Sequence, residues 1–326
     1  MIIHDDIRLL QDRLEKAENI AIFSHIRPDG DSLGAVLALG WALTDMGKKV
    51  QYISENPIPD RFHFLYQFME DGKVPFKTEP ENADCYILPD ISSIDRAGSF
   101  FIRHPEIVPD ICIDHHVSNP GFAAWNWIES DSPASCCVLT GLLPMINVPL
   151  TKRISSALLC GIITDTNSFS TSNVTAESLR SGADLVDNDA EIFNICHEAH
   201  KVHSLSETAL WKLGMDNMHV EGSLAWSVFR KAEMEAAGYT GDDDAGFVSY
   251  LGDTQGINVS VLFTEVSGNE VKISWRSLPG YDVSKVAVAC GGGGHAAASG
   301  ATIRKPLEEV IKQVLETTKS MLFPAK

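Results

Sequence analysis

The chain has 326 residues, 44% of them hydrophobic and 21% charged, which is enough for about two domains at roughly 150 residues each. Its 26 basic and 44 acidic residues give a net charge of −18, which disfavours a broad surface for duplex nucleic acid but still permits short anionic substrates. The N-terminus has no signal-like segment and no apolar stretch approaches the roughly 18 residues of a membrane span. We therefore expect a cytoplasmic protein without a membrane anchor.

The first part of the chain alternates short apolar strands with helices. Gly47 is expected to end the first predicted helix and Thr175 to cap the last one. We predict strands at residues 19–24, 50–53, 84–88 and 108–113, and helices at residues 32–46, 134–146, 152–163 and 176–186. This alternation predicts a parallel, doubly wound α/β sheet over residues 1–188, with ligands bound at the carboxyl ends of the strands.

The second part of the chain predicts a smaller α/β domain. Residues 189–220 are charged and helical in pattern, and we expect them to connect the two domains. Within residues 221–326 we predict strands at 224–229, 257–264 and 270–276, and helices at 282–289 and 306–321.

Acidic and imidazole side chains gather where the apolar runs of the first domain end. They are His25, Asp29 and Asp31 after the first strand, Asp90 after the third, Asp114, His115 and His116 after the fourth, and Asp165 after the run 158–163. Although the run 158–163 belongs to a predicted helix, we group Asp165 with the strand-end sites, because it too follows an apolar segment. Together these groups predict a metal cluster at one edge of the sheet.

The spacing of these side chains favours two ions. Asp29 and Asp31 are two residues apart in a turn, so each can serve a different ion. Asp90 can bridge the two ions, while His115 and Asp165 can complete the second. Imidazole with several carboxylates suits Mn²⁺ better than an all-oxygen Mg²⁺ site or a thiolate zinc site, and Mg²⁺ or another divalent ion is the alternative.

Two such ions predict phosphoryl chemistry. In two-metal hydrolases the ions lie about 3.5–4 Å apart, activate water and neutralise phosphate oxygens. We therefore take Asp90 and His116 as candidate catalytic residues, with His116 donating to the phosphate.

A glycine run in the second domain predicts a binding loop for an anion. Backbone amides in such a run can approach a ligand closely, and Arg276 can clamp a terminal phosphate with two hydrogen bonds. The candidate substrate-binding residues are Arg276, Gly291, Gly292, Gly293, Gly294 and His295.

These motifs resemble those of the DHH phosphoesterases, and most closely the NrnA-type oligoribonuclease (nanoRNase) and pAp phosphatase group. The carrying segments are residues 24–34, Asp90 with Arg96, residues 113–116, residues 161–166 and residues 291–295. Their order and spacing cover nearly the whole chain. The chain departs from the family at Pro89 and at the alanines 296–298, and the second departure bears on substrate choice.

The resemblance implies a catalytic DHH domain and a smaller C-terminal DHH-associated domain, with the active site in the cleft between them. It implies that His25, Asp29 and Asp90 hold one manganese ion. It implies that the second ion is held by Asp31, Asp90, His115 and Asp165. His116 would then act at the phosphate, and Arg276 with the loop 291–295 would hold the substrate.

The expected activity is that of a manganese-dependent phosphodiesterase and phosphatase. It would degrade short RNA oligonucleotides as an exonuclease and remove the 3′-phosphate of 3′-phosphoadenosine 5′-phosphate (pAp). The partners would be short RNAs and small nucleotides, not long duplexes or membranes, and the protein would be a monomer or homodimer. The alternatives are a cyclic-di-AMP or pApA phosphodiesterase, an inorganic pyrophosphatase and a catalytically inactive nucleotide sensor.

Overall fold

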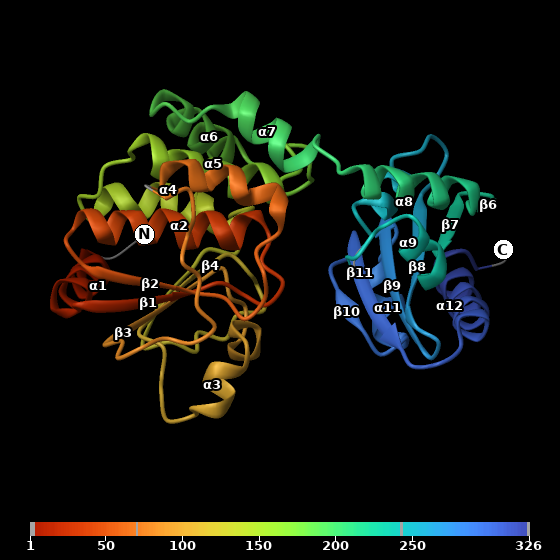
Figure 1. The fold of residues 1–326 in the computed structure, drawn as a ribbon, viewed down its shortest axis with the longest axis horizontal. Helices are drawn as coiled ribbons and strands as arrows, with labels where there is room; N and C mark the ends of the chain where they lie inside the picture. Colours follow the sequence, from red (N-terminus) through yellow and green to blue (C-terminus); the bar gives the residue numbers. More distant parts are fainter. Residues whose placement is uncertain (1–3, 70, 242–243, 325–326) are drawn as a thin grey trace. The chain divides into compact units, whose positions relative to one another are not determined.

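The computed structural model describes residues 4–69, 71–241 and 244–324, drawn in Figure 1. The chain divides into two compact units, Met1–Val202 and His203–Lys326. The division falls inside the segment 189–220. Helix α7 (Ile192–His200) therefore belongs to the first unit and α8 (Leu205–Asp216) to the second.

The first unit is built on a five-stranded sheet with the order β2-β1-β3-β4-β5. Every neighbouring pair is parallel, which confirms the predicted parallel α/β sheet. The strands are β1 (Asn19–Phe23), β2 (Lys49–Ile53), β3 (Cys85–Pro89), β4 (Ile111–Asp114) and β5 (Trp125–Ile128). The sequence prediction found the first four and missed β5, which has only four residues.

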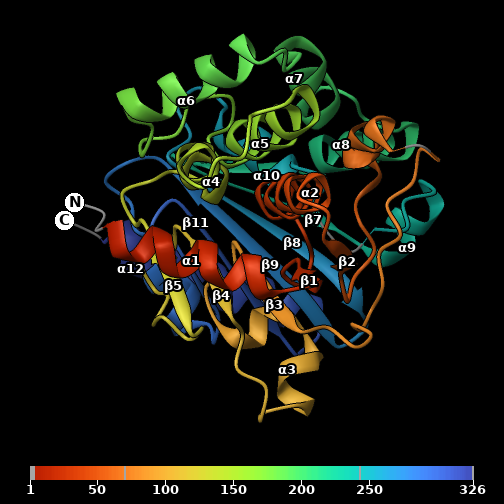
Figure 2. The same ribbon diagram turned by 90° about the vertical axis from the view of Figure 1, so that its left-hand side faces the viewer.

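Helices cover this sheet on both faces. The larger helices α2, α4, α5, α6 and α7 lie together on one side in Figures 1 and 2, and α3 lies on the other. Alternation along β1 sends Ile20 and Ile22 into the larger core, and Ala21 and Phe23 into a smaller one near α3. The helices are α1 (His4–Lys16), α2 (Gly30–Asp45), α3 (Ser99–Arg103), α4 (Ser135–Met145), α5 (Lys152–Asp165) and α6 (Ala176–Asp187), with 3₁₀ turns η1 (Asp60–Phe68) and η2 (Ile94–Ala97).

Two predicted helix ends agree with the structure. Gly47 follows α2 with a φ of 82°, as a helix-ending glycine requires. Thr175 caps α6 through a reciprocal capping box with Ser178. The grouping of Asp165 with strand ends is wrong, because Asp165 is the last residue of helix α5.

The second unit contains a six-stranded mixed sheet with the order β10-β11-β9-β8-β7-β6. Only β7 and β8 are parallel neighbours. The strands are β6 (His219–Glu221), β7 (Leu224–Phe229), β8 (Val259–Ser267), β9 (Glu270–Ser277), β10 (Gly293–Gly294) and β11 (Ala298–Ile303). The remaining helices are α9 (Lys231–Ala236), α10 (Phe247–Gly252), α11 (Val283–Ala289) and α12 (Leu307–Leu322). The prediction missed β6, β10, β11, α9 and α10.

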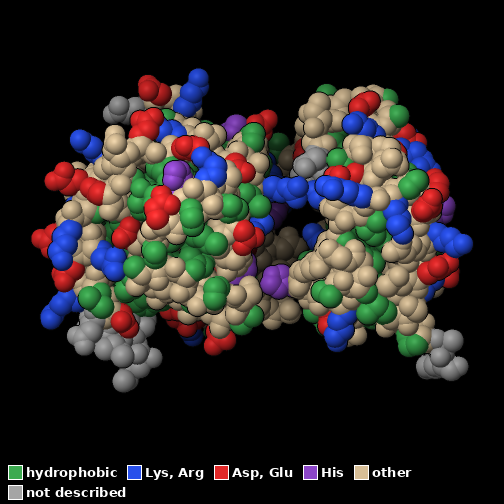
Figure 3. Space-filling view, turned by 90° about the horizontal axis from the view of Figure 1, so that it is seen from below, with side chains coloured by type: hydrophobic (Ala, Val, Ile, Leu, Met, Phe, Trp, Pro, Cys, Tyr) green, Lys and Arg blue, Asp and Glu red, His purple; other side chains and the backbone are tan. Residues whose placement is uncertain are grey.

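The surface agrees with the mixed composition of the sequence. Acidic and basic side chains are interspersed on the face drawn in Figure 3. Within the described residues, no helix combines the length and apolar character needed to cross a membrane.

Candidate metal centre

The predicted metal-binding side chains of the first unit come together where β1, β3 and β4 end. His25 follows β1, Asp90 follows β3, and Asp114 is the last residue of β4. Asp29 caps the N-terminus of α2, whose first turn carries Asp31. Asp165 comes from the C-terminus of α5, which packs closely on α2. The parallel sheet therefore supplies most of the centre, and the helix pair supplies the rest.

The first donor group consists of His25, Asp29 and Asp90. His25 Nε2 lies 3.4 Å from Asp29 Oδ2 and 3.5 Å from Asp90 Oδ2. His25 Nδ1 lies 2.9 Å from the Ile26 carbonyl oxygen and 3.3 Å from Arg96 Nη2, while Nε2 faces the carboxylates. An imidazole nitrogen facing two carboxylates calls for a cation or a proton between them.

The pKa of His25 reflects this arrangement. Burial by itself lowers the pKa of His25, but hydrogen bonds to Asp29 and Asp90 outweigh it and raise the pKa to about 10. In the absence of a metal the group is therefore held as an imidazolium, and a divalent cation can replace that proton.

The second donor group consists of Asp31, His115 and Asp165. His115 Nδ1 lies 3.2 Å from the Ser132 carbonyl, which fixes the proton on Nδ1. His115 Nε2 is buried without a hydrogen-bond partner, 3.5 Å from Asp165 Oδ2 and 3.6 Å from an oxygen of Asp90. A buried imidazole nitrogen without a partner among carboxylates fits a metal ligand.

Asp31 is held by the N-terminus of α4. The amides of Ser135 and Cys136 donate to its two carboxylate oxygens at 2.6 and 2.9 Å. Even so, burial, followed by the negative charge of Asp90, raises the pKa of Asp31 well above its usual range. Burial and the charge of Asp31 do the same to the pKa of Asp165. A divalent cation would relieve this crowding of carboxylates.

Asp90 belongs to the first group and, with Asp114, His115 and His116, to a further possible donor group, and its Oδ1 lies 3.6 Å from His115 Nε2 of the second group. Its side chain is 2% exposed, and it accepts a hydrogen bond from Ser135 Oγ at 3.0 Å. Its φ of 56° lies in the left-handed region, which costs a non-glycine residue roughly 1–2 kcal/mol. Strain of this kind at a buried carboxylate is typical of a functional position.

The two histidines of the Asp-His-His motif face different partners. His116 Nδ1 lies 2.8 Å from Asp114 Oδ1, while His115 points to the second donor group. Burial lowers the pKa of His116, but the hydrogen bond to Asp114 and the negative charges of Asp90, Asp114 and Asp31 together outweigh it and raise that pKa. Asp114 thus orients His116, whose Nε2 is left available to a ligand.

The predicted substrate-binding residues lie in the second unit. Arg276 is in β9, opposite Ala298 of β11, and its Nη1 donates to the Trp275 carbonyl at 2.9 Å. His295 is exposed at the tip of the β10–β11 hairpin. Gly291, Gly292, Gly293 and Gly294 lead into this hairpin.

The glycine run differs from the open anion nest that we expected. The amides of Gly291, Gly292 and His295 donate to protein carbonyls, so these three are not free for a ligand. A Cβ at Gly292 would lie 2.1 Å from the Gly300 carbonyl oxygen, so glycine is needed there for close packing. A ligand at this loop therefore cannot bind through those three amides, whereas the His295 ring is exposed.

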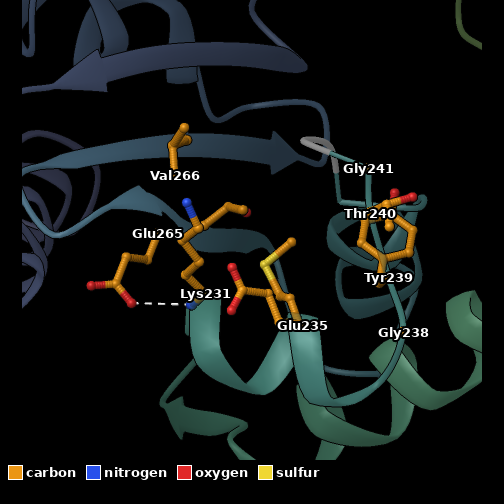
Figure 4. A pocket seen from close by; sticks show the side chains of 10 residues that line it. Lys231, Glu235, Gly238, Tyr239, Thr240, Gly241, Glu265 and Val266 are labelled. Carbon is orange, nitrogen blue, oxygen red and sulfur yellow. Dashed lines mark hydrogen bonds between the residues drawn. The ribbon is translucent and has the colours of Figure 1, made fainter.

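A separate pocket of about 440 Å³ lies in the second unit, between α9 and the end of β8. Figure 4 shows Lys231, Glu235, Tyr239 and Glu265 around it, with the Lys231 amide donating to Glu265 Oε2 at 3.0 Å. It holds no potential metal-binding group of three side chains. Within the described part of the chain, such groups occur only at the centre in the first unit.

Sequence reasoning missed two residues of the centre. Ser135 contacts both Asp31 and Asp90, although it is 104 and 45 residues away from them in the chain. Asn119 donates to Asp114 Oδ2 at 2.6 Å. For Asn119 the sequence offered one signal, a polar residue soon after the Asp-His-His motif. An asparagine in a turn before Pro120 is an equally good explanation of that residue.

Known proteins share both units of this chain. Residues 19–162 match the DHH family, N-terminal domain, and residues 227–322 match the DHHA1 domain. The Thermus thermophilus protein named bifunctional oligoribonuclease and PAP phosphatase NrnA is 29% identical over 325 residues, covering 98% of this chain and 96% of its own.

Solved structures share the fold. An exopolyphosphatase-related protein from Bacteroides fragilis has a TM-score of 0.86 at 22% identity, with 98% of this chain and 97% of its own covered. RecJ from Thermus thermophilus, solved in complex with Mn²⁺, has a TM-score of 0.54 at 12% identity, with 97% of this chain and 54% of its own covered. The matched domains and the centre at the sheet edge lead to one conclusion: the chain is a phosphoesterase of the DHH family, with a DHH domain followed by a DHHA1 domain.

Proposed function

We propose that this phosphoesterase hydrolyses short oligoribonucleotides and removes the 3′-phosphate of pAp, with two manganese ions as cofactors. The observation that carries the proposal is the pair of buried imidazole nitrogens, His25 Nε2 and His115 Nε2, each within 3.6 Å of two carboxylate oxygens. The substrate class is supported by relatives named oligoribonuclease and PAP phosphatase, which match most of the chain.

The ligand assignment follows the two donor groups. We propose that His25, Asp29 and Asp90 hold one ion. The other ion would be held by Asp31, Asp90, His115 and Asp165. When bound, such ions supply an activated water and neutralise phosphate oxygens.

The protein's own residues would then position the substrate. As the imidazolium, which its raised pKa favours, His116 would be oriented through Nδ1 by Asp114 and would donate from Nε2 to a phosphate oxygen. Arg276 and His295 would hold the terminal phosphate or base of the substrate, beside the glycine run of Gly291, Gly292, Gly293 and Gly294. The net charge of −18 disfavours long polyanions and so supports short substrates.

A comparison of rates tests this proposal. Purified protein with added Mn²⁺ is assayed against pAp, pApA, cyclic-di-AMP and RNAs of about two to five nucleotides, with inorganic pyrophosphate as a control. We expect the highest kcat/KM on short RNA and on pAp. A tenfold or greater preference for cyclic-di-AMP would overturn the substrate assignment, and nucleotide binding without turnover would indicate a sensor.

A further inference from the structure

We propose that Asn119 is a positioning residue that fixes the orientation of the His116 ring through Asp114. This inference rests on the proposed function, in which His116 donates to the phosphate. It concerns a contact chain that begins outside the donor groups and ends on the His116 ring.

The backbone places Asn119 in the same turn as His116. The Asn119 amide donates to the His116 carbonyl at 3.1 Å, which closes a turn over residues 116–119. The turn brings the Asn119 side chain back toward the ends of β3 and β4.

The side-chain amide of Asn119 has a defined orientation. Its Oδ1 accepts from the Gly121 amide at 2.8 Å, so its Nδ2 must face the other way. There Nδ2 lies 2.6 Å from Asp114 Oδ2 and 3.0 Å from the Ile91 carbonyl oxygen. Asn119 thus ties the residue after Asp90 to the last residue of β4.

Asp114 transmits this constraint to the histidine. It is fully buried, and its Oδ1 accepts from the His115 amide at 2.9 Å and lies 2.8 Å from His116 Nδ1. With Oδ2 occupied by Asn119, the carboxylate has one orientation in which all its partners are satisfied. An ionised carboxylate only accepts, so Nδ1 of His116 carries the proton.

Removing Asn119 would free the Asp114 carboxylate to rotate. Asp114 Oδ2 would then be a buried acceptor without its donor, and the His116 ring would lose its fixed orientation. Partners that orient a functional side chain in this way are typically worth 10–100-fold in activity.

A double-mutant cycle tests the proposal in the full-length chain. The proteins are wild type, Asn119→Ala, His116→Ala and the double variant, with Ser118→Ala, an exposed neighbour in the same turn, as the control. We expect Asn119→Ala to lower kcat on short RNA and pAp about 10–100-fold, with KM and Mn²⁺ affinity within about threefold. In the His116→Ala background the same change should cost less than about threefold, because its effect passes through His116.

Three results would overturn the proposal: an equal loss in both backgrounds, a fall in Mn²⁺ affinity that accounts for the loss of kcat, or an Asn119→Ala variant with wild-type kcat. If the alanine variant does not fold, Asn119→Asp keeps the side-chain shape and the Gly121 contact while removing the donor to Asp114, and it enters the same cycle.

The ring N–H signals of His116 in NMR spectra provide a readout that does not depend on the substrate. In Mg²⁺-loaded protein we expect a hydrogen-bonded Nδ1–H signal in wild type and exchange broadening of that signal in Asn119→Ala. An unchanged Nδ1–H signal would also overturn the proposal. Wild-type protein inactive on both substrates would refute the proposed function, and the Nδ1–H signal would still decide the role of Asn119.

Discussion

Asp90 offers the sharpest test of the proposed two-ion centre, because its one small side chain belongs to the first donor group and lies next to His115 of the second. Its carboxylate oxygens lie 3.5 Å from His25 Nε2 and 3.6 Å from His115 Nε2. Replacing Asp90 with alanine should therefore weaken both ions together and abolish hydrolysis. The φ of 56° at this position is unfavourable for any residue with a side chain. The Asp90→Gly variant should therefore fold at least as well as the Asp90→Ala variant.

The magnitude follows from linkage between binding and folding. A ligand present at 100 times its Kd stabilises the folded state by about 2.7 kcal/mol. For a unit of this size, 1 kcal/mol corresponds to roughly 2–4 °C in Tm, so Mn²⁺ should raise the wild-type Tm by roughly 5–10 °C. The Asp90→Ala variant should lose most of that shift.

Thermal unfolding of the purified protein with chelator and with increasing Mn²⁺ measures this effect. Asp187→Ala, which removes an exposed carboxylate at the end of α6, is the matched control and should keep the full shift. The bridging role of Asp90 would be refuted by an Asp90→Ala variant that keeps the wild-type Mn²⁺ shift and activity.

Three further predictions concern other parts of the chain. Mn²⁺ binding should release protons and tighten as pH rises, because His25, with a pKa raised to about 10, is protonated at neutral pH and must lose that proton to coordinate the ion. Calorimetry in buffers of different ionisation enthalpy counts the released protons. A count of zero at pH 7 would contradict the prediction. Gly161→Ala would place a Cβ 2.3 Å from Cys136 Sγ and should lower the free energy of unfolding in urea by about 1–3 kcal/mol. Gly141→Ala, in helix α4 with open space around it, should raise that free energy by about 0.5–1 kcal/mol. Equal effects of the two changes would argue against the packing explanation. His295→Ala should raise KM for pAp and leave the Mn²⁺ shift in Tm intact, and loss of that shift would show that His295 binds metal instead.

The strand ends and their donors were predictable because local signals agreed with the fold. Apolar runs of four to six residues that end on Asp or His lie in parallel strands, and the carboxyl ends of such strands share one edge. His25, Asp90 and His115 could therefore be grouped from the order of motifs along the chain. Strand β5 and the glycine strand β10 were missed, because four residues in one case and two glycines in the other carry almost no strand preference.

Other features of the centre depend on contacts between distant segments. Asp165 joins the donors because α5 packs on α2, and Gly34 and Gly161 permit that approach. Ser135 meets two carboxylates only because the N-terminus of α4 is directed at them. No local pattern encodes either contact, since each depends on how helices pack over the sheet.

The sequence alone therefore indicated the types of donor side chain, their order along the chain and, for His25, Asp90 and Asp114, the strand that carries or precedes each one. Tertiary structure decided how those side chains are used. It placed the Asp114 carboxylate against His116 Nδ1 and His115 Nε2 near Asp90 and Asp165, and it paired the amides of Gly291 and Gly292 with carbonyls at the end of helix α11. The physical reason is that donor types are properties of residues, whereas proton positions, hydrogen-bond partners and free amides are set by neighbours that lie far away in the chain.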